Sequence, residues 1–282
     1  MWLWMSVCSA LLLGIYDVAK KQALKRNGVY WILVSATALT ALFLSPCLTA
    51  GSLKDHLSLV LKAVLVSTSW VSGLYALKHL PLTTVSTIKA SRPMFVLIFS
   101  IILFGERLNL LQWLGVAVVM TALFLSSRSK RHDTDKETSA KGMTCMIISV
   151  LSGSASALYD KFILQHLEPL FVQSWTNIYI TVLLAAVMLV QYLADRQKFE
   201  PFRWDWRIPL IAVLITASDM LYFYSVKDPD ALLSVISMIR RSSVLITFLF
   251  GALMFKEGHI KDKAFDMALM MAGIALLLFG SA

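Results

Sequence analysis

Ten apolar stretches, each close to the length of a membrane-spanning helix, divide the chain from end to end. They are Trp2–Ala19, Val29–Thr49, Leu57–Leu77, Leu82–Phe104, Leu110–Leu125, Met143–Leu164, Phe171–Leu193, Ile208–Val226, Ala231–Phe255 and Ala264–Phe279. A helix needs about 20 mostly apolar residues to cross the hydrocarbon core of a bilayer. Charged residues make up only 15% of the chain, against roughly 25% in soluble domains, which excludes a soluble or disordered protein. We therefore predict an all-α membrane protein with ten transmembrane helices in the lipid bilayer.

The sequence carries no signal for catalysis, a metal site or a disulfide. The three cysteines are an odd number and lie in apolar stretches without metal spacing. The five histidines form neither a metal motif nor a catalytic cluster. No glycine-rich loop for a nucleotide phosphate is present, which predicts no cofactor and secondary rather than ATP-driven transport. The first stretch begins at Met1 without a basic segment before it, so we expect a retained helix, not a cleaved signal peptide.

Lysine and arginine in the connections predict the orientation in the membrane. One set of connections holds 17 basic residues and the other holds 5, and the richer side is expected to be cytoplasmic. The smaller set comprises Lys54, Lys62, Arg107, Lys161 and Lys227. With ten spans, both termini are then predicted to lie outside a plasma (inner) membrane. A polar, basic linker (residues 128–141) separates a first five-helix repeat (1–127) from a second (142–282).

Three sets of residues recur in the same order in the two halves of the chain. They are Tyr16-Asp17 with Tyr159-Asp160 at an offset of 143, Tyr75 with Tyr224 at 149, and Glu106 with Glu257 at 151. A unit of five spans is odd, so its second copy enters the membrane from the opposite side. The sequence thus predicts two inverted five-helix repeats, and transporters built in this way bind substrate near the middle of the bilayer.

This layout resembles the drug/metabolite transporter superfamily, EamA type. The resemblance also rests on Pro93 within the fourth stretch and on the sequence Phe-Gly-Glu-Arg-Leu (residues 104–108) that leaves it, and it covers essentially the whole chain. It implies a basket of ten helices around a central cavity that works by alternating access. It also implies cytoplasmic termini, whereas the basic residues predict the opposite; we follow the basic residues.

Four basic residues lie inside the apolar stretches, away from either surface. They are Lys89, Arg92, Arg240 and Arg241. Each costs about 2.5–3.5 kcal/mol at the bilayer centre on insertion scales, so they require a water-filled cavity, an internal partner or an anion. Lys89 and Arg92 share one helix face because they are three residues apart. Aligning the repeats on the two glutamates matches Lys89 with Arg240, and aligning them on the tyrosines matches Arg92 with Arg241.

These basic residues have two interpretations. In the first, Asp219, the acidic residue at mid-span, pairs with one of them and the others bind backbone carbonyls. In the second, they form a substrate site for an anion, because the planar fork of arginine suits carboxylate or phosphate. Asp219 is itself a candidate for carrying a coupling proton or for an ion pair. Asp17 and Asp160 lie near helix ends, beside Lys20 and Lys161, and local pairs with these lysines are one interpretation of them.

A second resemblance bears on the substrate. The nucleotide-sugar and triose-phosphate translocator branch of the same superfamily places a lysine and a Lys-Arg pair in corresponding helices. Lys89 with Arg240-Arg241 is similar to that arrangement, with arginine in place of one lysine. The similarity implies a phosphorylated substrate.

The remaining polar and aromatic candidates each have two interpretations. Residues that line the cavity, or alternatively serve helix packing, are Trp70, Tyr75, Tyr222, Tyr224, Ser86 and Ser237. Tyr16 and Tyr159 are candidates for gates or for interfacial tyrosines. Glu106 and Glu257 are expected to cap the ends of the fourth and ninth helices.

The sequence therefore predicts a secondary transporter or exchanger, not an enzyme, for a small organic anion that is phosphorylated or carboxylated. An exporter of amino acids or drug-like metabolites, and a flippase for a lipid-linked phosphate, are alternatives on the same fold. A membrane enzyme or assembly subunit that binds phosphorylated lipid is the alternative of another class. Coupling to a proton or a counter-substrate is expected, in a monomer or a homodimer. Nucleic acid is not expected as a partner.

Overall fold

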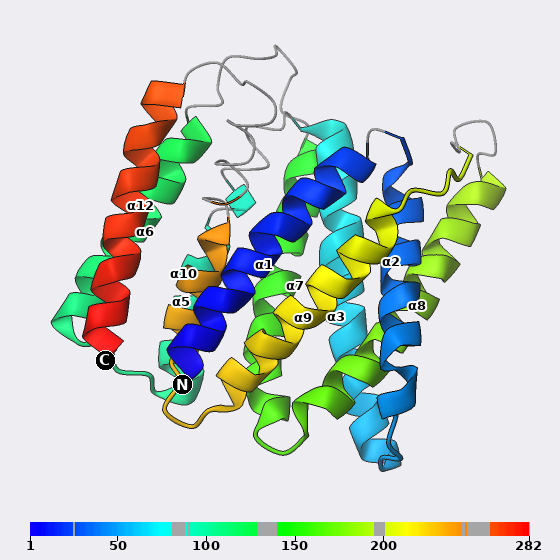
Figure 1. Cartoon of the computed structure of the whole chain (residues 1–282), viewed down its shortest axis with the longest axis horizontal. Coiled ribbons are helices and arrows are strands. Elements are labelled where there is room, and N and C mark those ends of the chain that lie inside the picture. The colour runs from blue at the N-terminus through cyan, green and yellow to red at the C-terminus, as the bar shows by residue number, and fades with distance from the viewer. Residues whose placement is uncertain are drawn as a thin grey trace.

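The computed structural model is all-helical across the residues it describes, which are 1–24, 26–80, 88–89, 91–128, 140–194, 201–243, 246 and 260–281. These residues form ten α-helices and one 3-10 turn, without a strand among them (Figure 1). The elements are α1 (Trp2–Ala23), α2 (Val29–Leu44), η1 (Ser45–Cys47), α3 (Leu53–His79), α5 (Arg92–Phe104), α6 (Leu110–Arg128), α7 (Ala140–Leu164), α8 (Pro169–Ala194), α9 (Arg207–Lys227), α10 (Leu233–Arg241) and α12 (Ile260–Ser281). The predicted fold class is confirmed.

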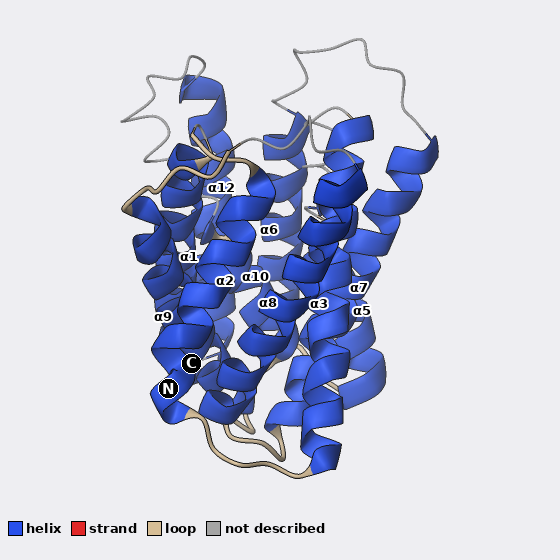
Figure 2. Cartoon of the chain, turned by 90° about the vertical axis from the view of Figure 1, so that its right-hand side faces the viewer, coloured by secondary structure: helices blue, strands red, loops and turns tan. Residues whose placement is uncertain are grey.

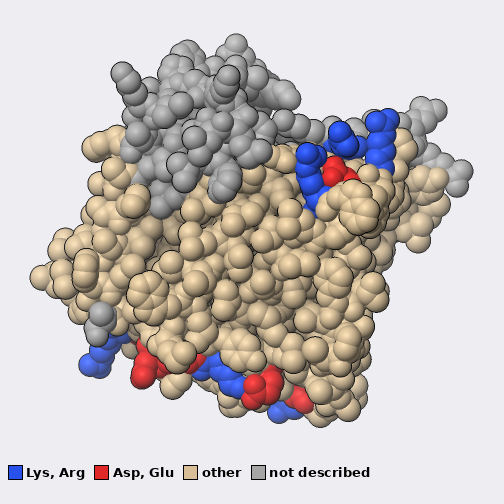
Figure 3. Space-filling model, viewed as in Figure 1, with Lys and Arg blue, Asp and Glu red and all other residues tan. Residues whose placement is uncertain are grey.

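The helices have the length and surface of a membrane bundle. Six of those described, α1, α2, α3, α7, α8 and α9, are long and apolar enough to cross a bilayer, and parts of α5, α6 and α12 are shorter apolar helices. In Figure 3, the charged residues on the visible face lie at the two ends of the bundle, and the described surface between them carries neither Lys and Arg nor Asp and Glu. This uncharged belt is the surface expected to contact lipid tails.

Local sequence signals set several helix ends. At the start of α3, Ser52 and Asp55 form a capping box, in which each side chain accepts a hydrogen bond from the backbone of the other. At the end of α5, Gly105 adopts φ 63° and ψ 28°, a left-handed conformation that glycine reaches without steric cost. Pro93 lies in the first turn of α5, where its missing N–H has no partner to lose.

The helix pairs follow the two-fold symmetry expected of inverted repeats. Repeat symmetry exchanges α1 with α7 and α3 with α9, so a contact of α1 with α9 should recur as a contact of α7 with α3. Both pairs pack along their lengths, and the repeat-equivalent pairs α2 with α8 and α6 with α12 also pack together (Figures 1 and 2). Helices α5 and α10, which belong to the equivalent fourth and ninth spans, pack on each other as well. The two-repeat architecture is therefore present in the packing as well as in the sequence.

Serine hydroxyls form similar reciprocal bonds in both of these helix pairs. Between α3 and α7, Ser69 donates to the carbonyl of Ser149 at 2.7 Å, and Ser149 donates back to the carbonyl of Ser69 at 2.6 Å. Between α1 and α9, Ser9 and Ser218 exchange the same reciprocal bonds at 2.7 and 2.9 Å. Small residues allow such close approach of helix backbones, which is the main way that helices associate in membranes.

The N-terminus and the C-terminus lie at the same end of the bundle, which we call the terminal face (Figures 1 and 2). A large hydrophobic cluster joins the start of α1 (Trp2), the end of α7 (Leu164), the end of α12 (Leu277) and most of α10. It continues into α6 as far as Leu123. The cluster therefore packs α10 against helices of both repeats.

Candidate functional site

The four basic residues predicted at mid-membrane lie where two short helices meet. Arg92 begins α5, and Arg240 and Arg241 end α10, which packs against it. Lys89 is helical and lies three residues before α5 begins. The structure thus brings both predicted basic pairs to one place between the repeats. We call Lys89, Arg92, Arg240 and Arg241 the basic junction.

Matching backbone turns show how the two pairs correspond. The Ser91 hydroxyl and N–H donate to the carbonyl of Ile88 at 2.6 and 3.1 Å. The Ser242 hydroxyl and N–H donate to the carbonyl of Ile239 at 2.6 and 3.0 Å. The two turns are 151 residues apart, the offset of the glutamate alignment, so Lys89 is the repeat partner of Arg240.

Each arginine of this group donates to a different partner. Arg240 forms an ion pair with Asp219 of α9, and its guanidinium carbon lies 4.2 Å from the centroid of the Tyr222 ring. Arg241 donates to the backbone carbonyl of Lys89 at 2.7 Å. Arg92 donates to the backbone carbonyl of Gly153 in α7. Of the described carboxylates, only that of Asp219 lies within ion-pair distance of any of these arginines or of Lys89.

Lys62 is a fifth cation inside the bundle, and the prediction that it lies in a connection between helices is wrong. It was counted with the connections, but it lies within α3, is 3% exposed and forms an ion pair with Asp160 of α7. Its ammonium also lies 4.1 Å from the centroid of the Phe223 ring of α9. The signal available in the sequence was its position inside an apolar stretch, five residues after that stretch begins.

The expected local pair of Asp160 with Lys161 is also wrong. Neighbouring side chains on a helix point about 100° apart and do not face each other. Asp160 therefore faces Lys62 of α3, whereas Lys161 binds Glu106 at 2.8 Å. The Asp160 carboxylate also lies within electrostatic range of Arg240, which connects the buried pair to the basic junction.

Positive charge exceeds negative charge in the interior of the described bundle. The interior cations are Lys20, Lys62, Lys89, Arg92, Arg240 and Arg241, and the interior carboxylates are Asp17, Asp160 and Asp219. Asp160 and Asp219 are held in ion pairs, and Asp17 lies within electrostatic range of Lys20, Arg241, Lys89 and Arg240. Six cations against three carboxylates leave a formal excess of +3, and this excess of positive charge suits an anion.

The aromatic and serine candidates divide between this junction and other places. Tyr222 is 6% exposed and lies under Arg240. Trp70 packs at a hydrophobic cluster of α2, α3 and α8. Tyr75 accepts a hydrogen bond from Gln191 at 2.8 Å, and Tyr224 is 45% exposed.

The other predicted residues are placed as follows. Ser237 is half-buried on α10, and Ser86 lies outside the described residues. Tyr16 is buried and accepts a hydrogen bond from Lys20 at 3.3 Å. Tyr159 stacks on Phe162 at 6.0 Å between ring centroids. Within the described ranges, no three His, Cys, Asp or Glu side chains are grouped so as to hold a metal ion.

The expectation that Glu106 caps the helix before it is wrong. Gly105 ends α5, and Glu106 instead accepts hydrogen bonds from the backbone N–H groups of Leu233 and Ser234 at the start of α10. The sequence could not reveal this contact because the partners are 127 and 128 residues apart. Glu257 lies outside the described residues.

Gly153→Ala is expected to displace Arg92 and to lower the free energy of unfolding by about 1–3 kcal/mol, the usual effect of overpacking. A Cβ at this position would lie 2.8 Å from Cζ of Arg92 and 2.7 Å from Oγ of Ser69. Thermal unfolding in detergent measures the effect. The control is Ser152→Ala on the same helix, whose hydroxyl bonds only the carbonyl of Ile148. Wild-type stability of Gly153→Ala would contradict the packing of Arg92 against α7.

Comparison with known proteins agrees with this architecture. The model of the EamA-like transporter family matches residues 1–128 and 140–279, one block for each repeat. No curated protein is a significant match. A solved crystal structure, described only as that of a protein, superimposes over 98% of this chain and 98% of its own with a TM-score of 0.75 and 14% identity. That likeness is one of fold. The resemblance to the drug/metabolite transporter superfamily is confirmed.

Proposed function

Because the chain belongs to the EamA-like transporter family, and is thus an integral multi-pass membrane transporter, we propose that its cargo is a small organic anion. The anion carries two negative charges, on a phosphate or on carboxylates, and is bound by Lys89, Arg92, Arg240 and Arg241. Alternating access moves it across the membrane, either in exchange for a second anion or with a proton carried by Asp219.

The observation that carries this proposal is the excess of positive charge in the interior of the described bundle. Unpaired cations in a low-dielectric interior cost several kcal/mol each, and this cost falls when an anion neutralises them. Arg92 and Arg241 each donate one hydrogen bond to a backbone carbonyl. A guanidinium has five N–H donors, so both side chains keep donors for a ligand.

The same charge argues against the alternatives. A drug-like cation would be repelled by the junction, and a zwitterionic amino acid would leave the excess charge unneutralised. A flippase for a lipid-linked phosphate shares the anionic chemistry and differs in the lipid tail. An enzyme acting on phosphorylated lipid needs a nucleophile or general base at the junction, and Asp219 is engaged by Arg240.

The test is a ligand screen followed by transport. Purified protein is heated with inorganic phosphate, sugar phosphates, dicarboxylates, amino acids and cationic drugs in turn. A bound ligand at 100 times its Kd stabilises the folded state by about 2.7 kcal/mol, so dianions are expected to raise the Tm. Proteoliposomes loaded with the best anion should then exchange it for labelled external anion without chemical change.

Three outcomes would overturn this proposal in different ways. Stabilisation and transport of a cation or a neutral amino acid, with no response to dianions, would refute the anionic substrate. Movement of a short-chain lipid phosphate without movement of soluble anions would favour the flippase. Product formation by the protein in detergent would favour the enzyme.

The orientation belongs to the same proposal: both termini lie outside a plasma (inner) membrane. Removing the buried Lys62 from the connections of the terminal face increases the asymmetry of 17 to 5 basic residues on which the orientation rests. A protease-cleavable tag at the C-terminus should be cut on intact cells. A tag cut only after the cells are opened would place the termini in the cytoplasm.

A further inference from the structure

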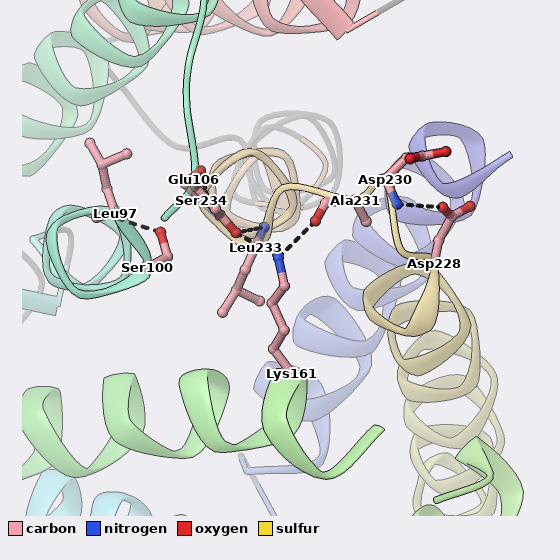
Figure 4. A network of polar contacts seen from close by, with 9 residues as sticks. All are labelled: Leu97, Ser100, Glu106, Lys161, Asp228, Asp230, Ala231, Leu233 and Ser234. Carbon is pink, nitrogen blue, oxygen red and sulfur yellow. Dashed lines mark hydrogen bonds and ion pairs between the residues drawn. The ribbon is translucent and has the colours of Figure 1, made fainter. Parts of the chain in front are cut away.

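A polar network joins the two repeats at the terminal face (Figure 4). Glu106 accepts hydrogen bonds from the N–H of Leu233 at 2.6 Å, the N–H of Ser234 at 3.2 Å and the hydroxyl of Ser234 at 2.5 Å. Lys161, in the last turn of α7, donates to Glu106 at 2.8 Å and to the carbonyl of Ala231 at 2.9 Å. Every bond to Glu106 therefore crosses from the first repeat to the second. We call Glu106, Lys161, Leu233 and Ser234 the latch.

The latch contains a buried carboxylate, that of Glu106, with hydrogen-bond donors around it. Glu106 is 7% exposed and lies at the start of α10, where free N–H groups and the helix dipole favour an anion. Although burial by itself raises the pKa of Glu106, hydrogen bonds from Lys161, Ser234 and Leu233 lower it below its usual value. The carboxylate is therefore charged at neutral pH, and separating the repeats here removes its partners all at once.

Helix α10 connects the latch to the basic junction. Glu106 binds its first turn, and Arg240 and Arg241 occupy its last turn. Nine residues of helix span about 13 Å, and the side chains between are buried, including Val235, Ile236 and Met238. A short helix packed in this way moves as a unit, so a shift of its arginines displaces the end that Glu106 holds.

We propose that the terminal face opens and closes as a gate during transport, and that the latch bonds hold it closed. Glu106 is the residue that positions α10 in the closed state. A hydrophobic cluster that includes Leu233 and Ile236 packs α10 against helices of both repeats, and the latch fastens the start of α10 to the first repeat at the terminal face. In inverted-repeat transporters the interface between the repeats is the one that moves. An open gate would let substrate reach the basic junction. The inference therefore rests on the proposed transport function, which requires such an opening.

The test measures access to α10 from the terminal face. Ser237→Cys, two turns or less from either end of α10, is introduced into protein whose three native cysteines are replaced by alanine. Proteoliposomes oriented with the tag outward are treated with a membrane-impermeant maleimide. Glu106→Gln is expected to speed labelling about tenfold or more, equivalent to about 1.4 kcal/mol. Lys161→Met should act in the same direction.

A matched pair at the same face provides the control. Lys227 binds Glu168 at 2.6 Å, but both residues belong to the second repeat, and Glu168 is 74% exposed. Glu168→Gln should leave the labelling rate unchanged. Equal rates in wild type and Glu106→Gln, or equal acceleration by Glu168→Gln, would overturn the latch.

A second measurement keeps the proposal testable if Glu106→Gln does not fold. Hydrogen exchange in the Lys161→Met protein should be faster at the N–H groups of Leu233 and Ser234 than in wild type, and equal exchange would overturn the latch. The anion proposal fails separately. If Glu106→Gln opens the terminal face but inorganic phosphate and succinate neither bind nor move, the latch stands and the substrate class is wrong.

Discussion

Lys62→Met is expected to lower the free energy of unfolding by about 3–5 kcal/mol, because it leaves the buried carboxylate of Asp160 without its ion-pair partner. The side chains of Lys62 and Asp160 are only 3% and 8% exposed, so water does not replace the lost partner. The ammonium also contacts the ring of Phe223, so one side chain fastens α3 to both α7 and α9. Unfolding in detergent with increasing denaturant measures the change.

A second variant separates the charge from the packing. Lys62→Met combined with Asp160→Asn removes both charges, and replacing a buried ion pair by neutral residues is often nearly neutral for stability. The double variant should therefore recover most of the loss. Lys54→Met, on the exposed first turn of the same helix, should change stability by about 0.5 kcal/mol or less. A single Lys62→Met variant as stable as wild type would contradict the buried pair.

The transmembrane fold is predictable because its main constraint, the apolar length of each span, can be recognised in a short stretch of sequence. A span must be apolar over the thickness of the bilayer, and α3, α8 and α9 follow from that requirement with small errors at their ends. The inverted repeat follows from parity and from matches such as Tyr75 with Tyr224. The closeness of the fourth and ninth spans, to which α5 and α10 belong, also follows, because equivalent spans of an inverted repeat meet near the symmetry axis.

The pairing of charges inside the bundle is not predictable in the same way. Lys62 and Asp160 are 98 residues apart, and only the packing of α3 on α7 brings them together. Asp160 and Lys161 are neighbours in sequence but point in different directions. Basic residues in the middle of an apolar stretch, such as Arg240, are conspicuous in the sequence, whereas their partners depend on helix rotation and packing.

Arg241→Gln is expected to reduce anion exchange in proteoliposomes by roughly 30- to 100-fold at wild-type stability. A hydrogen bond to a charged group contributes about 1.5–3 kcal/mol, and 1.4 kcal/mol corresponds to a factor of ten. Arg241 has no described carboxylate within ion-pair distance, and its bond to the carbonyl of Lys89 is one that glutamine can also donate. Asp17 lies within electrostatic range of Arg241, but Lys20 and Lys89 also act on it, so the replacement leaves no buried carboxylate without a nearby cation.

Arg240→Gln provides the contrast, because it removes the partner of Asp219. This variant should lose both transport and stability, and adding Asp219→Asn should restore stability but not transport. Arg203→Gln, at an exposed arginine, should leave both unchanged. If Arg241→Gln instead exchanges anions at the wild-type rate, the basic junction holds the helices together and the substrate binds elsewhere. The two roles can thus be told apart by measurement. Replacing a residue that only binds the anion lowers transport and leaves stability unchanged, whereas replacing a residue that holds the helices together lowers stability as well.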